Sequence, residues 1–131
     1  MRLHAKRAGL TLAALVLTFV VFRAALHVSP DANLNLGSYN IHHLFVGLIL
    51  IALGGIPLAI FSGEGRWLDG ATVLFGVGLG MALDEWVYLI TTDGSDASYL
   101  LPISFRGGLA MIGLACAYAA VLIRLGRPPG K

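Results

Sequence analysis

The chain is poor in charge and in cysteine. Lysine, arginine, aspartate and glutamate make up 12% of its 131 residues, about half the fraction that is usual in a soluble domain. The one cysteine, Cys116, lies among alanine and leucine residues and cannot form an internal disulfide. The composition therefore argues against a soluble domain, a disulfide framework and a redox site.

Motifs of several enzyme classes are also missing. The sequence contains neither the His-Glu-x-x-His pattern of zinc proteases nor the Glu-x-x-His pattern of di-iron bundles. Gly76-x-Gly78-x-Gly80 lies inside an apolar stretch and does not open a strand-turn-helix unit, as a dinucleotide-binding fingerprint does. These glycines instead indicate close packing between helices.

Long apolar stretches are what the chain does contain. Four of them cover residues 8–27, 41–62, 71–91 and 101–123, separated by short polar segments. Each approaches or exceeds the ~20 residues that a helix needs to cross a bilayer. We predict an all-α fold, in which residues 1–131 form one integral membrane domain, an up-down four-helix bundle, with a disordered basic tail at residues 125–131. A cleaved secretory signal is the alternative for the first stretch, although Arg23 before the small residues argues against cleavage.

The basic residues predict the orientation in the membrane. They precede the first stretch, follow the last or lie in the second connection: Arg2, Lys6, Arg7, Arg66, Arg124, Arg127 and Lys131. The first and third connections contain no lysine or arginine. Because basic residues stay on the cytoplasmic side, we predict a multi-pass protein of the cell (inner) membrane with both termini in the cytoplasm. The sequence pI near 9 follows from this distribution and does not indicate nucleic-acid binding.

Ionisable residues inside the apolar stretches are predicted to lie in the outer half of the membrane. They are Arg23, His27, His42, His43, Asp84, Glu85 and Arg106, and all of these except His27 are candidate site residues. His43, Asp84 and Arg106 each lie on the same helix face as a stripe of small residues, and such a stripe marks the face that packs against other helices. We therefore expect these three residues to form a cluster inside the bundle. His42 and Glu85 are expected at its flank, and Arg23 either faces the acidic pair or extends towards the lipid headgroups.

The chemistry of this cluster has three interpretations. His42, His43, Asp84 and Glu85 are candidate ligands for a divalent metal such as zinc or iron. Without a metal, Asp84, Glu85 and His43 are candidate acid–base groups for a lipid-like or apolar substrate. In both cases Arg106 or Arg23 would hold an anionic group of the substrate.

The third interpretation is structural. The charges form ion pairs that set the helix packing, and the chain is a non-catalytic accessory or assembly subunit of a larger membrane complex. Its partners are then membrane lipids together with other membrane subunits or further copies of the chain, and not nucleic acid.

Two motifs carry a resemblance to a known group of proteins. Ile41-His42-His43 is followed by Gly47, and Gly76-x-Gly78-x-Gly80 is followed by Asp84-Glu85, then by Asp93 and Tyr99. Over residues 38–108 the chain resembles small uncharacterised four-span integral membrane proteins of bacteria and archaea, with a His-His start to one span and a Gly-rich span ending in Asp-Glu. The resemblance implies that the histidine and acidic pairs act as a unit. It also suggests Asp93 and Tyr99 as rim residues, and it implies no activity.

Overall fold

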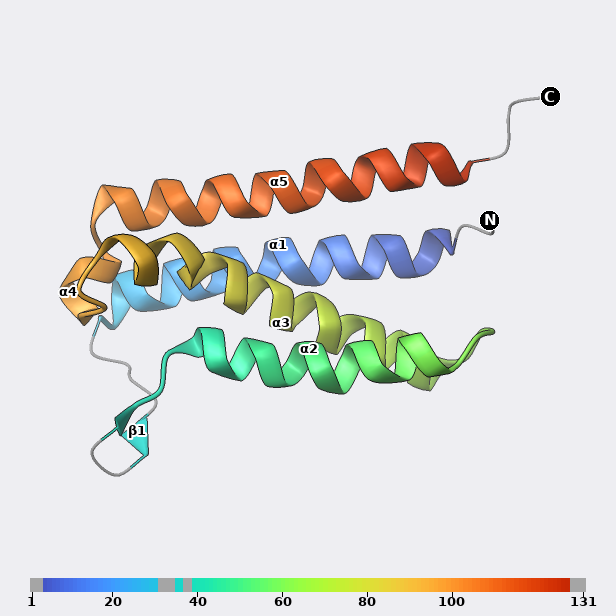
Figure 1. Ribbon diagram of the computed structural model, residues 1–131, viewed down its shortest axis with the longest axis horizontal. Coiled ribbons are helices and arrows are strands. Elements are labelled where there is room, and N and C mark those ends of the chain that lie inside the picture. The colour runs from blue at the N-terminus through green and yellow to red at the C-terminus, as the bar shows by residue number, and fades with distance from the viewer. Residues whose placement is uncertain (1–3, 31–34, 37–38, 128–131) are drawn as a thin grey trace.

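Four long helices run alternately up and down (Figure 1). The computed structural model describes residues 4–30, 35–36 and 39–127. The long helices are α1 (Ala5–Val28), α2 (His43–Ile60), α3 (Arg66–Thr91) and α5 (Pro102–Gly126). Within the described residues, these four are long and apolar enough to cross a membrane. The prediction of an all-α four-helix bundle is confirmed.

Several helix boundaries differ from the predicted spans. α3 begins at Arg66 rather than at residue 71, because its first turn is polar and extends beyond the apolar stretch. Asp69 in that turn interacts favourably with the positive end of the helix dipole. α5 begins with Pro102, whose missing N–H costs nothing at a helix start. α5 also continues to Gly126, so the predicted tail does not begin at residue 125, and residues 128–131 lie outside the described residues.

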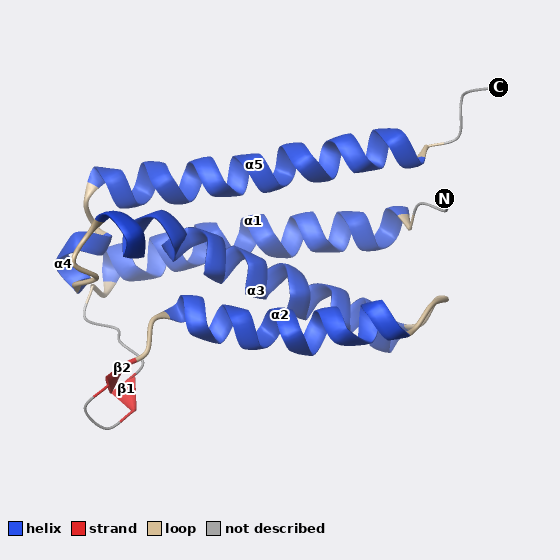
Figure 2. Ribbon diagram, in the orientation of Figure 1, coloured by secondary structure: helices blue, strands red, loops and turns tan. Residues whose placement is uncertain are grey.

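Three short elements lie at one end of the bundle (Figure 2). β1 (Asn35–Leu36) and β2 (Tyr39–Asn40) form a small antiparallel ladder, and α4 (Asp96–Tyr99) follows α3. Gly94 has a φ of +72°, which favours glycine, and lets the chain turn back directly after α3. The Ser95 side chain then accepts a hydrogen bond from the backbone N–H of Ser98 and caps α4. We call this end the α4 end, and the opposite end, where α1 begins and α5 ends, the terminal end (Figure 1).

α3 is the central helix and packs against α1, α2 and α5. It crosses the bundle diagonally, from α1 and α5 at the α4 end towards α2 at the terminal end (Figure 1). α1 and α5 also pack against each other, whereas α2 packs mainly on α3. Because α2 has so little contact with α1, the bundle is open between these two helices at the α4 end, where a pocket lies.

Glycines permit the close approach of α2 and α3. A Cβ atom at Gly78 would lie 2.5 Å from the carbonyl oxygen of Gly47, and one at Gly54 would lie 2.4 Å from that of Ala71. Such distances are shorter than any van der Waals contact, so only glycine fits at these positions. α1 and α5 meet in a small apolar core of Leu15, Phe19 and Ile112. The packing thus brings the polar residues of α3 close to both α1 and α2.

Candidate functional site

Arg23 on α1 reaches into the bundle and is almost completely buried, with 8% of its surface exposed. Its Nε donates a hydrogen bond of 2.6 Å to Oδ1 of Asp84. The two Nη atoms donate to the backbone carbonyls of Asp84, Tyr99 and Ser104 and to the Ser104 hydroxyl, at 3.1–3.3 Å. Five acceptor atoms therefore surround the five N–H groups of the guanidinium. No donor of Arg23 remains for another partner.

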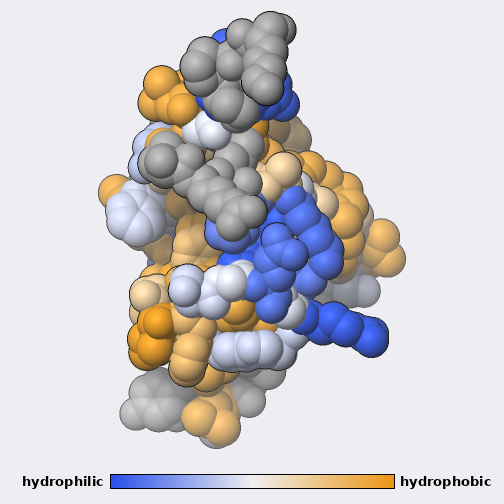
Figure 3. Space-filling view, turned by 90° about the vertical axis from the view of Figure 1, so that its right-hand side faces the viewer, coloured by the Kyte–Doolittle hydropathy of each residue, from blue (hydrophilic) through white to orange (hydrophobic). Residues whose placement is uncertain are grey.

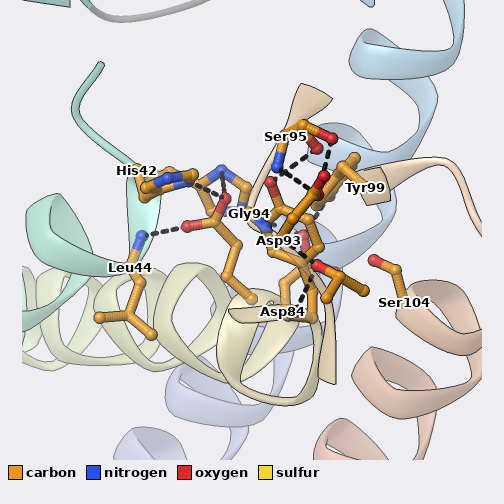
Figure 4. A network of polar contacts seen from close by, with 12 residues as sticks. His42, Leu44, Asp84, Asp93, Gly94, Ser95, Tyr99 and Ser104 are labelled. Carbon is orange, nitrogen blue, oxygen red and sulfur yellow. Dashed lines mark hydrogen bonds and ion pairs between the residues drawn. The ribbon is translucent and has the colours of Figure 1, made fainter. Parts of the chain in front are cut away.

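Asp84 on α3 is fully buried, with 0% exposure, and accepts from three side chains. Oδ1 accepts from Arg23, and Oδ2 accepts from His43 Nε2 at 3.1 Å and from the Tyr99 hydroxyl (Figure 4). Burial, and next the neighbouring Asp84 carboxylate, raise the pKa of Tyr99 above its ordinary value. Tyr99 therefore stays protonated and donates to Asp84. Gly108 on α5 makes room for this contact, because a Cβ there would lie 2.9 Å from Oδ1 of Asp84.

Glu85 caps the start of α2 from the neighbouring helix. Its Oε2 accepts a hydrogen bond of 2.7 Å from the backbone N–H of Leu44 (Figure 4). Its Oε1 lies 3.2 Å from Nδ1 of His43 and 3.4 Å from Nδ1 of His42. A carboxylate is favourable here because the first turn of a helix presents free N–H groups and the positive end of the dipole. Glu85 thus fixes where α2 begins relative to α3.

His43 lies between the two carboxylates. Nε2 is 3.1 Å from Oδ2 of Asp84 and Nδ1 is 3.2 Å from Oε1 of Glu85. Each ring nitrogen therefore faces one carboxylate oxygen, so His43 links Asp84 to Glu85. Arg23, His43, Asp84 and Glu85 are thus joined by direct contacts. We call these four residues together with Tyr99 and Ser104 the buried network.

A pocket of about 210 Å³ lies beside the buried network, between α1 and α2 with α3 as its floor. Its lining includes apolar side chains, among them Phe22, Leu26, Val46 and Met81. It also includes polar side chains, among them His42, Glu85, Tyr88 and Asp96. The His42 side chain is 20% exposed, more than that of any ionisable residue of the buried network. His42 is thus the histidine of the pair that a ligand can reach most easily.

Five of the six predicted residues come together, and Arg106 does not. His42, His43, Asp84, Glu85 and Arg23 form one constellation. The expectation that Arg106 joins the cluster is wrong. Its side chain is exposed on α5, and it makes no hydrogen bond or ion pair with another described residue. Arg23 occupies the place that Arg106 was expected to fill.

α5 carries two stripes of small residues, and the prediction for Arg106 was based on the stripe that faces outward. The stripe that includes Arg106 continues through Ala110, Gly113 and Ala117, all of which are exposed, and a Cβ at Gly113 would meet nothing within 4 Å. The buried face of α5 instead carries Ser104, Gly107, Gly108 and Ile112. The adjacent pair Gly107-Gly108 was the sequence signal for that face.

Ser104 and Asp93 also lie at the α4 end. Ser104, which was not among the predicted site residues, is fully buried and accepts a hydrogen bond from Arg23. Asp93, suggested as a rim residue, instead accepts hydrogen bonds within the turn before α4, from the Ser98 hydroxyl and from the backbone N–H and hydroxyl of Ser95 (Figure 4). These donors, Ser98 foremost, lower the pKa of Asp93 to about 2. Asp93 therefore stabilises the turn, whereas Tyr99 belongs to the buried network.

The arrangement of donors does not support the predicted metal site. Among residues 4–30, 35–36 and 39–127, no group of three or more His, Cys, Asp or Glu side chains is placed to hold a metal ion. The oxygens of Asp84 and Glu85 face N–H and O–H donors. A metal would need the lone pairs that these donors occupy.

Comparison with protein-family models, with curated proteins and with solved structures gives no match. The resemblance to small four-span membrane proteins stays a prediction. A functional interpretation of the chain therefore depends on the buried network and the adjoining pocket.

Proposed function

We propose that the chain is a multi-pass protein of the cell membrane, with both termini in the cytoplasm, that binds a small amphipathic molecule from the outer leaflet. The pocket between α1 and α2 supports the proposal, because apolar side chains and a histidine–carboxylate pair line it together. An apolar part of the ligand would contact Phe22, Leu26 and Met81, and a polar part would contact His42. Ligand sites commonly combine a mainly apolar lining with a few polar groups.

The size of the pocket limits the ligand. Its volume is about 210 Å³, whereas sites for drug-sized molecules measure about 300–1,000 Å³. We infer that the pocket takes a small molecule, or the polar head and first carbons of a longer chain, and not a complete phospholipid.

His42 is the proposed acid–base group. Glu85 lies 3.4 Å from Nδ1 of His42, so it favours the proton on that nitrogen and leaves Nε2 to accept or donate a proton. A histidine oriented by a carboxylate is a common general acid or base. In this proposal His43, which also lines the pocket, links Glu85 to Asp84, and Asp84 lies outside the lining and does not touch the ligand. Arg23, with all its donors bound, does not hold an anionic group of the ligand.

Blocking the pocket tests the proposal directly. Val46 lines the pocket, while Leu48 on the same helix is exposed on the outer surface of the bundle. The full chain is placed in nanodiscs that contain a single-chain lipid with a diazirine near its polar end. After irradiation, we expect mass spectrometry to find labelled peptides from α1 and α3 around the pocket. Val46→Trp should remove this labelling, and Leu48→Trp should retain it.

Histidine NMR gives a second measurement on the same samples. His27 is exposed at the end of α1 and does not line the pocket, so its signals serve as an internal reference for those of His42. We expect the single-chain lipid to shift the ring signals of His42 and not those of His27. Equal labelling of both tryptophan variants, with no selective change at His42, would contradict the proposal.

A specific observation favours the accessory-subunit alternative. Among the described residues, every buried polar side-chain atom already has a hydrogen-bond partner, so the buried network needs no ligand to be stable. This alternative predicts that the chain co-purifies with other membrane proteins in fixed proportion. A monodisperse homo-oligomer without partners would count against it.

Elemental analysis of the same preparations tests the metal interpretation. One zinc or iron ion per chain, lost in His43→Ala and in Asp84→Ala, would support that interpretation.

A further inference from the structure

A second hollow lies at the terminal end of the bundle, far from the pocket of the α4 end. The start of α1 and the connection from α2 into α3 form it, and its volume is about 460 Å³. Its charged or titratable lining residues are His4, Lys6, Arg7, Glu64, Arg66 and Asp69. Hydrophilic side chains gather in the middle of this face and extend to its right-hand edge, with apolar ones beside them (Figure 3). We call it the basic hollow.

Some of the basic side chains in the basic hollow have partners within the protein and one does not. Lys6 forms an ion pair of 2.5 Å with Asp69, and Arg7 lies 3.9 Å from the same carboxyl group. Arg7 also donates to the carbonyl oxygen of Gly63. Arg66, by contrast, is exposed and makes no hydrogen bond or ion pair with another described residue. With Glu64 and Asp69 counted against Lys6, Arg7 and Arg66, the hollow has one net positive charge, and His4 adds to it when protonated.

Two neighbouring features suit the basic hollow to an anion at the membrane surface. Gly65 precedes α3 without a side chain that could cap its first N–H groups, so these groups add to the positive potential of the lining arginine. Trp67 is 56% exposed and packs against Phe61 with 5.3 Å between ring centroids. Exposed tryptophan at a helix end is typical of the headgroup region of a bilayer. The hollow would therefore lie at the depth of lipid phosphates.

We propose that the basic hollow binds a phosphate group, with Arg66 as the principal contact and with Lys6 and Arg7 on the opposite side. Arginine matches a phosphate with paired donors, and lysine adds a point charge. Asp69 holds Lys6 and Arg7 in place and at the same time competes with the phosphate for them. The phosphate belongs either to an anionic phospholipid or to a free phosphate ion, and the experiment below distinguishes the two.

Titration of the purified full chain in a neutral detergent tests the proposal, with native mass spectrometry and Trp67 fluorescence as readouts. Phosphatidylglycerol, phosphatidylcholine and inorganic phosphate are the three probes. We expect phosphatidylglycerol to bind more tightly than phosphatidylcholine. Arg66→Gln should weaken phosphatidylglycerol binding about fivefold, the factor expected for one basic residue near an anionic lipid. Binding of inorganic phosphate alone at millimolar concentration, with the same dependence on Arg66, would assign the site to the free ion.

Arg124→Gln is the matched control. Arg124 is exposed in the last turn of α5, near the terminal end, but does not line the basic hollow. We expect it to leave phosphatidylglycerol binding within twofold of the wild type. Asp69→Asn should tighten binding, because it releases Lys6 and Arg7 from their carboxylate partner. An equal loss in Arg66→Gln and Arg124→Gln, weaker binding in Asp69→Asn, or no preference among the three probes would overturn the proposal.

Discussion

Arg23 is the residue on which the buried network depends. Its charge pairs with that of Asp84, and its planar guanidinium directs donors to acceptors on α3, α4 and α5 at once. It also lies 4.1 Å from the ring centroid of Tyr99. The sequence left Arg23 with two possible directions, because nothing in its own helix distinguishes a side chain that turns inward from one that extends to the headgroups.

Arg23→Lys should therefore destabilise the protein although it keeps the charge. Lysine has three N–H donors, so at least two of the five acceptors around Arg23 would be left without a partner. Each unpaired buried group costs about 1–3 kcal/mol, which predicts a loss of roughly 2–6 kcal/mol in the free energy of unfolding. Denaturant unfolding of the detergent-solubilised protein measures this loss.

The exposed arginine of α5 provides the control for this substitution. Arg106→Lys should change stability by less than about 0.5 kcal/mol, as surface substitutions usually do. Equal effects at Arg23 and Arg106 would show that the two side chains are not placed as described.

Among the helices, α3 makes the decisive contacts because it presents glycine to two neighbours. Gly78 lies against α2, while Gly76 and Gly80 lie against α1. In a helix with about 3.6 residues per turn, residues two positions apart point in nearly opposite directions. Gly78 therefore lies on the side of α3 opposite to Gly76 and Gly80. The Gly-x-Gly-x-Gly pattern was correctly interpreted as a packing motif. Its division between two neighbouring helices became visible only once their positions were known.

Gly78→Ala should separate α2 from α3. Its Cβ would lie 2.5 Å from the carbonyl oxygen of Gly47 and 2.7 Å from the backbone nitrogen of Ile51, so backbone atoms must move. Overpacking of this kind typically costs about 1–3 kcal/mol. Thermal unfolding followed by tryptophan fluorescence measures it. Gly113→Ala on the open face of α5 is the control and should be neutral or slightly stabilising, because alanine favours a helix. A smaller loss at Gly78 than at Gly113 would contradict the described packing.

The molecule as a whole has two different ends. The terminal end carries the basic hollow. The α4 end carries the turn that contains Asp93 and the pocket that adjoins the buried network. Because the four helices alternate in direction, both ends of the described chain lie on the same side (Figure 1). If basic residues stay in the cytoplasm, the pocket faces the outer leaflet and the basic hollow the inner one.

Cysteine labelling tests this orientation. In a Cys116→Ala background, Ala97→Cys places a thiol in α4 and Ser62→Cys places one in the connection between α2 and α3, both at exposed positions. A maleimide that cannot cross the membrane should label Ala97→Cys in intact cells and Ser62→Cys only after permeabilisation. The opposite labelling pattern would show that the protein has the inverse orientation in the membrane, with the pocket open to the inner leaflet.

Much of the fold and part of the site were predictable from residue order alone. The number of long helices follows from hydropathy summed over about 20 residues. The free energy of moving so many apolar residues out of water is too large for local packing to reverse. The association of the histidine and acidic pairs also followed, because four ionisable groups at similar depth in an apolar bundle are stable only when they meet.

Helix rotation and helix contacts could not be obtained in the same way. α5 carries two small-residue stripes of nearly equal quality, and the choice between them depends on packing of Gly107 and Gly108 against α3. That choice put Ser104 beside Arg23 and left Arg106 on the outer surface. The pocket exists because α2 packs on α3 rather than on α1. Hydropathy specifies which segments leave water, but van der Waals contact between particular faces decides which side chains meet.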